Sequence, residues 1–150
     1  MGREKYEIRL IKQSELGELL NLYKYLNPDD PEIDTNKITS LWEDICKDKN
    51  LIYLAVVIDN QLVSSCVLTI IPNLTRNARP YGLIENVVTH PNFRRKGYGS
   101  SVLKEALSVA WMRNCYKVML LTGSKKPETL RFYENTGFKM GIKTGFIATP

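Results

Sequence analysis

The sequence predicts an α/β fold in which helices cover a mixed β-sheet. Two patterns alternate along the chain: apolar residues at helical spacing, and short runs rich in β-branched residues, which are typical of strands. One pair of runs indicates a hairpin, and a later run is followed by a helix and a further run. Hairpins and strand–helix–strand units together indicate a sheet layered with helices. A chain of 150 residues, 43% of them apolar, has the size of one domain, which we expect over residues 1–150.

The first third of the chain predicts one strand and two helices. Residues 5–11, KYEIRLI, alternate between polar and apolar side chains as a strand does. Ser14 is the expected cap of a helix that the segment NPDDP ends, and Thr35 is the expected cap of the next helix. The apolar side of the first helix consists of Leu16, Leu19, Leu20, Tyr23 and Leu26, and that of the second consists of Ile38, Leu41, Trp42 and Ile45.

The middle of the chain predicts a hairpin and a long strand. Residues 51–72 are rich in β-branched side chains and are divided by Asp59-Asn60, a pair that favours a tight turn. After the polar loop at 73–79, residues 81–90 predict another strand. Pro91 stops this strand because proline cannot donate a ladder hydrogen bond.

The last third alternates between helices and strands. A long helix follows the loop that contains Gly97 and Gly99, and residues 117–123 then predict a buried strand. Pro127 begins a further helix, and Gly137 is placed to end it at the C′ position. A last strand is expected over residues 143–149. The inward side of the long helix consists of Leu103, Ala106, Leu107 and Ala110.

The composition argues against several classes of protein. No run of about 18 apolar residues is present, and the charged opening MGREKYEIRLIKQSE does not resemble a secretory signal, so we expect a cytoplasmic protein without a membrane partner. The chain has 3 cysteines, far apart in the sequence, and a single histidine, His90. This argues against a disulfide framework and against a metal site. The net charge of +5 suits either nucleic acid or a polyanionic small ligand.

The segment RRKGYGSS at 94–101 has the chemistry of an anion site. Gly97 and Gly99 lie between a predicted strand and a predicted helix, where the lack of Cβ atoms lets backbone N–H groups approach a ligand. The first amides of a helix have no partners within it, and the helix dipole favours negative charge there. Ser100 and Ser101 add hydroxyl groups, and the preceding basic residues raise the local positive potential.

Common phosphate-loop motifs do not account for this segment. A Rossmann fingerprint requires a third glycine where Val102 stands, and the Gly-Lys-Ser/Thr sequence of a P-loop is absent. The residues alone therefore leave three alternatives open. These are a phosphate site of another type, part of a nucleic-acid surface, and a tight turn whose basic residues face solvent.

Two motifs in the C-terminal half together resemble the GNAT superfamily of acyl-CoA-dependent N-acetyltransferases. The loop of that family reads Arg/Gln-x-x-Gly-x-Gly/Ala, and Arg94, Gly97 and Gly99 match it. A later helix of the family often carries Phe-Tyr-Glu-x-x-Gly-Phe, which stands here at 132–138. The resemblance covers residues 81–138 at the level of motifs. It implies a mixed, mostly antiparallel central sheet flanked by about four helices, with a splayed pair of strands at the cofactor cleft.

The resemblance implies acetyl-CoA as the cofactor and CoA as the product. The pyrophosphate would bind backbone amides of residues 95–100, with a hydroxyl from Ser100 or Ser101. The strand before the loop would pair with the pantetheine arm. Lys126 or Arg131 could meet the cofactor's phosphates or face solvent. The cofactor-binding candidates are Val87, Val88, Thr89, Arg94, Arg95, Lys96, Gly97, Tyr98, Gly99, Ser100, Ser101, Lys126, Arg131 and Tyr133.

Three groups are candidates for the chemistry that the resemblance implies. The backbone N–H of Val87 could polarise the thioester carbonyl, with that of Val88 as the alternative. A protonated amine must lose a proton before it attacks, and Glu85 is placed to accept that proton directly or through water. Tyr133 is the candidate proton donor to the leaving thiolate. In the alternative interpretation, Glu85 is a structural carboxylate and Tyr133 is a core residue.

The residues around Glu85 do not determine which amine is the acceptor. The spacing of Glu85 to the glycine loop is similar to that in the family's glucosamine 6-phosphate acetyltransferases, but Asn86 stands where those proteins have Asp. Arg76 and Arg79, which precede the strand, could recognise an anionic acceptor or could simply be solvated.

We therefore predict an acetyl-CoA-dependent N-acetyltransferase that transfers the acetyl group directly to a primary amine in a ternary complex. The acceptor would be a small molecule or a peptide, and a homodimer is possible. The alternative is a non-catalytic acyl-CoA-binding or sensing module on the same scaffold, which would not need Glu85 and Tyr133. A nucleic-acid-binding domain would want a basic stripe with exposed aromatic residues. Because the positive charge gathers near the glycine loop, no nucleic-acid partner is expected.

Overall fold

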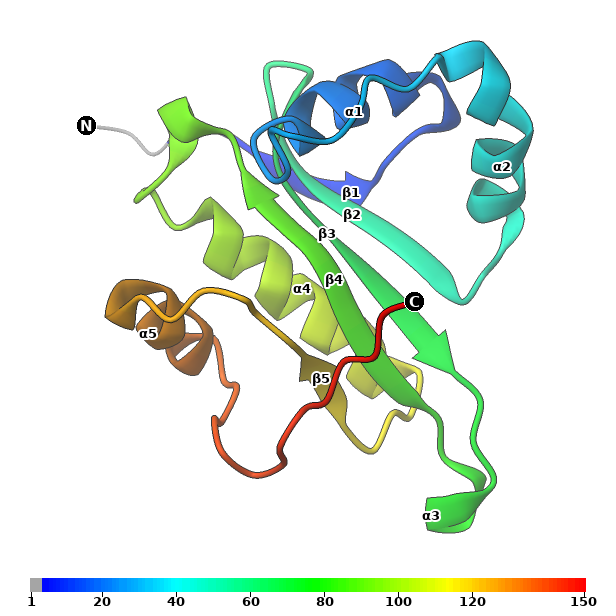
Figure 1. Ribbon diagram of the computed structural model, residues 1–150, viewed down its shortest axis with the longest axis vertical. Coiled ribbons are helices and arrows are strands. Elements are labelled where there is room, and N and C mark those ends of the chain that lie inside the picture. The colour runs from blue at the N-terminus through cyan, green and yellow to red at the C-terminus, as the bar shows by residue number, and fades with distance from the viewer. Residues whose placement is uncertain (1–3) are drawn as a thin grey trace.

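The computed structural model describes residues 4–150, which form a five-stranded sheet with helices on both faces (Figure 1). The strand order is β1-β2-β3-β4-β5. Neighbouring strands from β1 to β4 are antiparallel, and β5 is parallel to β4. The predicted mixed, mostly antiparallel sheet is therefore confirmed. The strands are β1 (Glu7–Leu10), β2 (Leu51–Ile58), β3 (Gln61–Ile71), β4 (Tyr81–Thr89) and β5 (Val118–Leu120).

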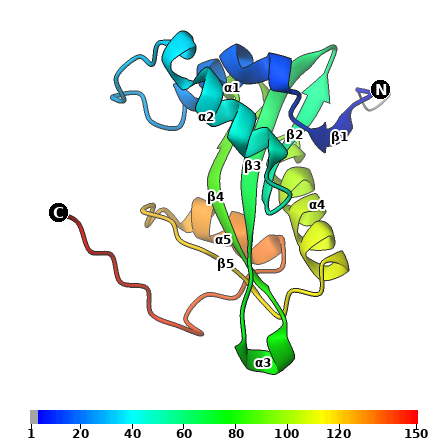
Figure 2. The ribbon, with the colours of Figure 1, turned by 90° about the vertical axis from the view of Figure 1, so that its right-hand side faces the viewer.

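The helices lie on opposite faces of this sheet. Figure 2 shows α4 on one face and α1 with α2 on the other. Helix α5 packs against the same core as α4 through Phe132 and Tyr133. The short α3 is irregular, because Arg76 and Asn77 within it have left-handed backbone. The helices are α1 (Leu16–Tyr23), α2 (Thr35–Lys47), α3 (Thr75–Ala78), α4 (Tyr98–Met112) and α5 (Pro127–Asn135), with 3₁₀ turns at Gln13–Glu15 and Pro91–Phe93. Within residues 4–150, no helix has the length and apolar character needed to cross a membrane.

Strand β2 has apolar residues on both faces because it separates two cores. Leu54 and Val56 pack in the core beneath α4, whereas Ala55 and Val57 pack in the core beneath α1 and α2. A strand buried on both sides needs a continuous apolar run, which residues 51–58 supply. The turn at Asp59-Asn60 is confirmed, since both residues have positive φ angles, 46° and 63°, as a tight hairpin turn requires.

The helix caps differ from those predicted. Helix α2 is capped by Asp34, whose carboxylate accepts the Asn36 N–H at 3.0 Å, and Thr35 is the first helical residue. Ser14 lies within the 3₁₀ turn before α1 and makes no cap there. Both expectations were wrong. Asp34, one residue before Thr35, supplies the carboxylate that caps α2, whereas α1 begins after Glu15 without a side-chain cap.

The predicted last strand at 143–149 does not form. Residues 139–150 belong to no helix or strand, and all of them are exposed. The sheet ends at β5, which is only three residues long and half-buried rather than buried. A strand needs a neighbour for its backbone groups, and this segment finds none within the described chain.

Candidate active site

The loop between β4 and α4 presents a row of free backbone amides. Arg95 and Gly97 have positive φ angles of 61° and 88°, which turn the chain into α4. The first helical hydrogen bond runs from the Ser101 N–H to the Gly97 carbonyl at 3.0 Å. Within residues 4–150, no backbone carbonyl accepts a hydrogen bond from the N–H groups of residues 95–100. Together with the helix dipole, these amides form a site for an anion.

The two positions of this loop, 97 and 99, require glycine for different structural reasons. A Cβ atom on Gly97 would meet nothing within 4 Å, so Gly97 is favoured by its left-handed backbone alone. A Cβ atom on Gly99 would lie 3.1 Å from the Phe132 ring and 3.2 Å from Thr89 Oγ1. Gly99 therefore lets α4 pack closely against α5 and the end of β4. The sequence interpretation, in which both glycines give a ligand access, was incomplete for Gly99.

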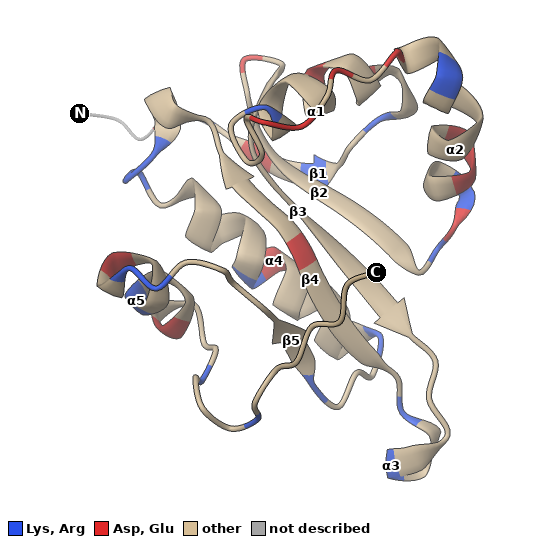
Figure 3. Ribbon diagram, viewed as in Figure 1, with Lys and Arg blue, Asp and Glu red and all other residues tan. Residues whose placement is uncertain are grey.

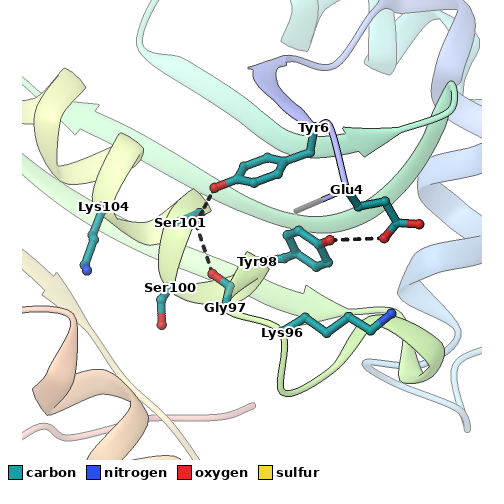
Figure 4. A pocket seen from close by; sticks show the side chains of 8 residues that line it. All are labelled: Glu4, Tyr6, Lys96, Gly97, Tyr98, Ser100, Ser101 and Lys104. Atoms are coloured by element: carbon teal, nitrogen blue, oxygen red, sulfur yellow. Dashed lines mark hydrogen bonds between the residues drawn. The ribbon is translucent and has the colours of Figure 1, made fainter. Parts of the chain in front are cut away.

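A hollow of about 600 Å³ opens at the N-terminal end of α4 (Figure 4). The N-terminal segment forms one wall, because Tyr6 Oη lies 3.2 Å from Ser101 Oγ and the Tyr98 hydroxyl donates to Glu4 at 3.3 Å. Sequence reasoning missed this wall, since Tyr6 is 95 positions from Ser101 and belongs to no motif. The lining residues are Glu4, Tyr6, Lys96, Gly97, Tyr98, Ser100, Ser101 and Lys104.

The structure distinguishes between the two serines at the start of α4. The Ser101 hydroxyl donates to the Gly97 carbonyl at 3.0 Å and also contacts Tyr6. No such bond within the described residues engages the Ser100 hydroxyl, so Ser100 is the better candidate to meet a phosphate. Tyr98 is buried, which leaves only its backbone N–H to contribute.

Strand β4 carries a β-bulge just before the loop. Asn86 and Val87 both lie opposite Cys66 of β3, and none of the three has a partner in the β3–β4 register. Asn86 has a φ angle of 52°, a left-handed conformation that asparagine tolerates better than most residues. A bulge of this kind leaves backbone groups outside the ladder. It favours Val87 over Val88 as the amide open to a ligand, because Val88 is paired with β3.

Some hydrogen-bonding groups at the end of β4 are already engaged by neighbouring residues. The Thr89 hydroxyl lies 2.8 Å from Ser64 Oγ, and the Thr89 carbonyl accepts a hydrogen bond from Arg94 Nε at 3.1 Å. The Arg94 side chain thus folds the loop back onto β4. Of the candidates for pairing with a ligand, Val87 therefore has the backbone groups that are most available for new hydrogen bonds.

Strands β4 and β5 diverge near the β-bulge of β4. Their parallel ladder joins only residues 82–84 to residues 118–120. From residue 85 onward, β4 has no β5 partner, although it continues to Thr89. The splayed strand pair expected from the family resemblance is therefore confirmed, and the gap begins beside Glu85.

The FYENTGF motif at 132–138 forms the end of α5. Gly137, with a φ angle of 108°, donates its N–H to Glu134, and Phe138 donates its N–H to the Tyr133 carbonyl at 3.3 Å. This is a Schellman motif, and it confirms the predicted C′ position of Gly137. The rings of Tyr133 and Phe138 meet edge to face with centroids 6.3 Å apart. Phe138 and the helix end together orient the Tyr133 ring.

The Tyr133 hydroxyl is influenced by its burial and by the charge of Glu85. Burial raises the pKa of the Tyr133 hydroxyl, and the neighbouring Cys66 and Glu85 raise it further. A tyrosine whose pKa is raised stays protonated at neutral pH and can donate a proton. Glu85 is exposed on β4, so its carboxylate is open to an incoming acceptor.

Cys66 does not suit a covalent role. The thiol is fully buried, and burial raises its pKa to about 12. The thiolate is the nucleophilic form of cysteine, and a thiol with this pKa is almost entirely protonated near neutral pH. Glu85 and Tyr133 therefore remain the candidate reacting groups at the splay.

Some basic residues singled out in the sequence lie away from this site. Figure 1 shows α3, with Arg76, at the opposite end of β4 from the glycine loop. Arg79 donates to the carbonyls of Asn114 and Cys115, both at 3.2 Å. Arg79 thus joins the start of β4 to the end of α4. The structure does not bring Arg76 and Arg79 to the candidate site.

Positive charge is more widely spread than the sequence suggested. Figure 3 shows basic residues in the loop before α4 and on α5, and others at the far end around α3 and the start of β5. Lys126 precedes α5 and Arg131 lies on it, both exposed. Among the described residues, neither side chain has a hydrogen bond or an ion pair to the residues of the candidate site.

The comparison with known protein families agrees with this geometry. Residues 19–138 match the model of the acetyltransferase (GNAT) family. The chain belongs to this family. A GNAT fold accounts for the splayed strands, the glycine loop at the start of α4 and the aromatic motif on α5 as parts of one arrangement.

Several proteins are similar to this GNAT chain. A glucosamine 6-phosphate N-acetyltransferase from Trypanosoma brucei brucei is 28% identical over 135 residues, which are 89% of this chain and 88% of that protein. A putative acetyltransferase from Agrobacterium tumefaciens str. C58 is 41% identical, with a TM-score of 0.91 over 96% of this chain and 99% of that chain. A glucosamine-6-phosphate N-acetyltransferase from Arabidopsis thaliana is 22% identical, with a TM-score of 0.83 over 98% of this chain and 99% of that one, and shows the shared fold.

Proposed function

We propose that this GNAT protein is an acetyl-CoA-dependent N-acetyltransferase that moves the acetyl group to a primary amine by direct attack in a ternary complex. One observation carries the proposal: a row of free amides opens beside splayed strands, at the level of Glu85. Membership of an acetyltransferase family supports the class of reaction.

The residues at the start of α4 suit the cofactor. The free amides of residues 95–100 and the Ser100 hydroxyl would hold the pyrophosphate, and Lys96 and Lys104 at the hollow would add positive charge. Val87, at the bulge, would pair with the pantetheine arm. When bound, acetyl-CoA supplies the acetyl group in activated form, as a thioester.

Each reacting group then has one task. Glu85 accepts a proton from the ammonium form of the acceptor, directly or through water. The Val87 N–H stabilises negative charge on the carbonyl oxygen. The Tyr133 hydroxyl, kept protonated by its raised pKa, donates a proton to the departing sulfur.

The acceptor in this proposal is a small-molecule primary amine. The relatives named as glucosamine 6-phosphate N-acetyltransferases make that amino sugar the first acceptor to test. Asn86 at the bulge distinguishes this chain from the family's sugar enzymes at one position, so related amines belong in the same panel.

The test is a panel of primary amines incubated with acetyl-CoA, with release of free thiol as the signal. We expect release that depends on both the amine and the enzyme, with the acetylated amine as the second product. Tight binding of CoA without thiol release from any amine would support a sensing module instead. Absence of CoA binding at millimolar concentration would refute both functions.

A further inference from the structure

Glu85 belongs to the face of the sheet that α1 and α2 cover. It lies opposite Val67 on β3, and Val67 lies opposite Tyr53 on β2. Residues directly opposite one another in a sheet project to the same face. Tyr53 packs against the core beneath α1 and α2, so Glu85 projects to that face as well.

The bulge adds Asn86 beside Glu85. Val87 packs against the core beneath α4, whereas Val88 belongs to the core beneath α1 and α2. Strict alternation from Glu85 would give these two valines the opposite faces, so Asn86 is the extra residue. Its side chain is exposed and its φ angle is 52°. A carboxylate and a carboxamide are therefore neighbours where β4 leaves β5.

Helix α1 brings a buried hydroxyl to this part of β4. Tyr23, the last residue of α1, packs against the core that contains Val88. The Tyr23 hydroxyl oxygen is buried, and no hydrogen bond within the described residues engages it. Burial, Tyr53 and Cys66 raise the pKa of this hydroxyl, whereas the Asn86 side chain lowers it. That lowering is the effect of an amide N–H directed at the tyrosine oxygen.

The unpaired hydroxyl has no benefit for packing alone. A phenylalanine would fill the same space without the cost of a buried polar group that lacks a partner. Rotation of the exposed Asn86 carboxamide can supply the partner, with Asn86 Nδ2 as the donor. An asparagine side chain can present either its NH₂ group or its carbonyl oxygen. Once Nδ2 is directed at Tyr23, Asn86 Oδ1 is left to face the splay.

We propose that Tyr23 orients the Asn86 carboxamide so that Asn86 Oδ1 accepts an N–H of the acceptor amine beside Glu85. This inference rests on the proposed function and deepens it. An ammonium group has three N–H bonds. One proton passes to Glu85, directly or through water, and the hydrogen bond to Oδ1 persists on the neutral amine. It limits the directions in which the nitrogen lone pair can point. Tyr23 is thus a positioning residue that acts through Asn86.

The contact can be tested without any acceptor. The side-chain amide signals of Asn86 in a ¹⁵N-labelled protein are identified by their loss in Asn86→Asp. Tyr23→Phe removes only the hydroxyl and should shift these signals. Tyr53→Phe, the same change in the same core, is the matched control and should leave them in place. Asn86 signals that Tyr23→Phe does not move would overturn the proposal, whatever the activity of the protein.

Kinetics test the consequence of the contact. Tyr23→Phe should lower kcat/KM for the amine by about tenfold, the effect of one hydrogen bond, and leave the KM for acetyl-CoA unchanged. In an Asn86→Asp background both side-chain oxygens accept hydrogen bonds in any orientation, so Tyr23→Phe should have little further effect.

Two kinetic results would overturn the proposal. One is an equal loss from Tyr23→Phe in both backgrounds, and the other is wild-type turnover that Tyr23→Phe does not change. Absence of thiol release from the wild type with every amine would instead refute the proposed function, while the Asn86 signals would still report whether Tyr23 contacts Asn86.

Discussion

Tyr133 shows how a single side chain acquires its chemistry from its surroundings. Burial raises its pKa, so the hydroxyl remains a proton donor through neutral and mildly alkaline pH. Tyr133→Phe removes the hydroxyl with little change in volume, and turnover should fall by about ten- to ten-thousand-fold while CoA affinity persists. Steady-state kinetics and calorimetry measure the two effects. Tyr116→Phe, in the loop before β5, is the matched control. Unchanged turnover in Tyr133→Phe would make Tyr133 a core residue.

Glu85 is tested by the pH dependence of the reaction. Glu85→Gln keeps the shape of the side chain but cannot accept a proton. The loss in kcat/KM should be greatest at lower pH, where the acceptor amine is mostly protonated, and should shrink as rising pH supplies free amine. The profile of Glu43→Gln on α2 serves as the reference for the same substitution elsewhere. A Glu85→Gln profile parallel to that of wild type would remove the base assignment.

Glu15 joins the start of α1 to strand β1. Its carboxylate accepts both Arg9 Nη groups, at 2.8 and 3.2 Å, and the Lys12 N–H at 3.0 Å. Burial works against the ionised form, but these hydrogen bonds outweigh it and lower the pKa of Glu15. A carboxylate with a lowered pKa stabilises the fold above its ordinary pKa, and this stabilisation is lost as the pH falls through the lowered value.

Glu15→Gln should therefore reduce the free energy of unfolding by about 1–3 kcal/mol at neutral pH. The difference from wild type should vanish as the pH falls below the lowered pKa of Glu15, in denaturation curves at a series of pH values. Glu32→Gln is the control, because Glu32 is 89% exposed at 3.5 Å from Lys24 and such pairs contribute little. An equal loss at acidic and neutral pH would show that the charge of Glu15 is not what matters.

At the level of whole elements, the glycine loop joins β4, α4 and α5. Gly97→Ala adds a methyl group in open space but at a positive φ, so it should cost about 1–2 kcal/mol of stability. Gly99→Val brings side-chain atoms against Phe132 and Thr89, and should cost about 1–3 kcal/mol by overpacking while displacing α5.

Chemical denaturation and turnover together distinguish the two glycines. Gly97→Ala should mainly weaken CoA binding, whereas Gly99→Val should also lower kcat because Tyr133 lies on the displaced helix. Gly17→Ala in α1, where a Cβ atom meets nothing within 4 Å, should be neutral or stabilising. If Gly99→Val were as stable and active as wild type, the close packing of α4 on α5 would not matter.

For the molecule as a whole, ligand binding should appear as added stability. A ligand that binds only the folded state stabilises it by about 2.7 kcal/mol at about 100 times its dissociation constant. CoA and acetyl-CoA should raise the melting temperature in a concentration-dependent way. Duplex and single-stranded nucleic acids serve as the comparison, and any effect they have should fade steeply with salt. Stabilisation by nucleic acid at physiological salt, with none by CoA, would contradict the proposed function.

Local patterns in the sequence determined much of this protein. The hairpin within 51–72, its Asp59-Asn60 turn and the Gly137 helix end could all be predicted, because each depends on neighbouring residues and backbone geometry. The glycine loop and the 132–138 motif also pointed to their site, since both are short and contiguous. Physical rules for helix starts, turns and strand periodicity act over a few residues, and these features obey them.

Tertiary structure alone decided the features that depend on distant contacts. Position 99 requires glycine because Phe132, from another helix, packs against it. Tyr6 reaches the hollow only because the N-terminal segment lies beside α4. The strand pattern at 143–149 remains unpaired because strand formation requires a partner, and no local pattern states whether the chain provides one.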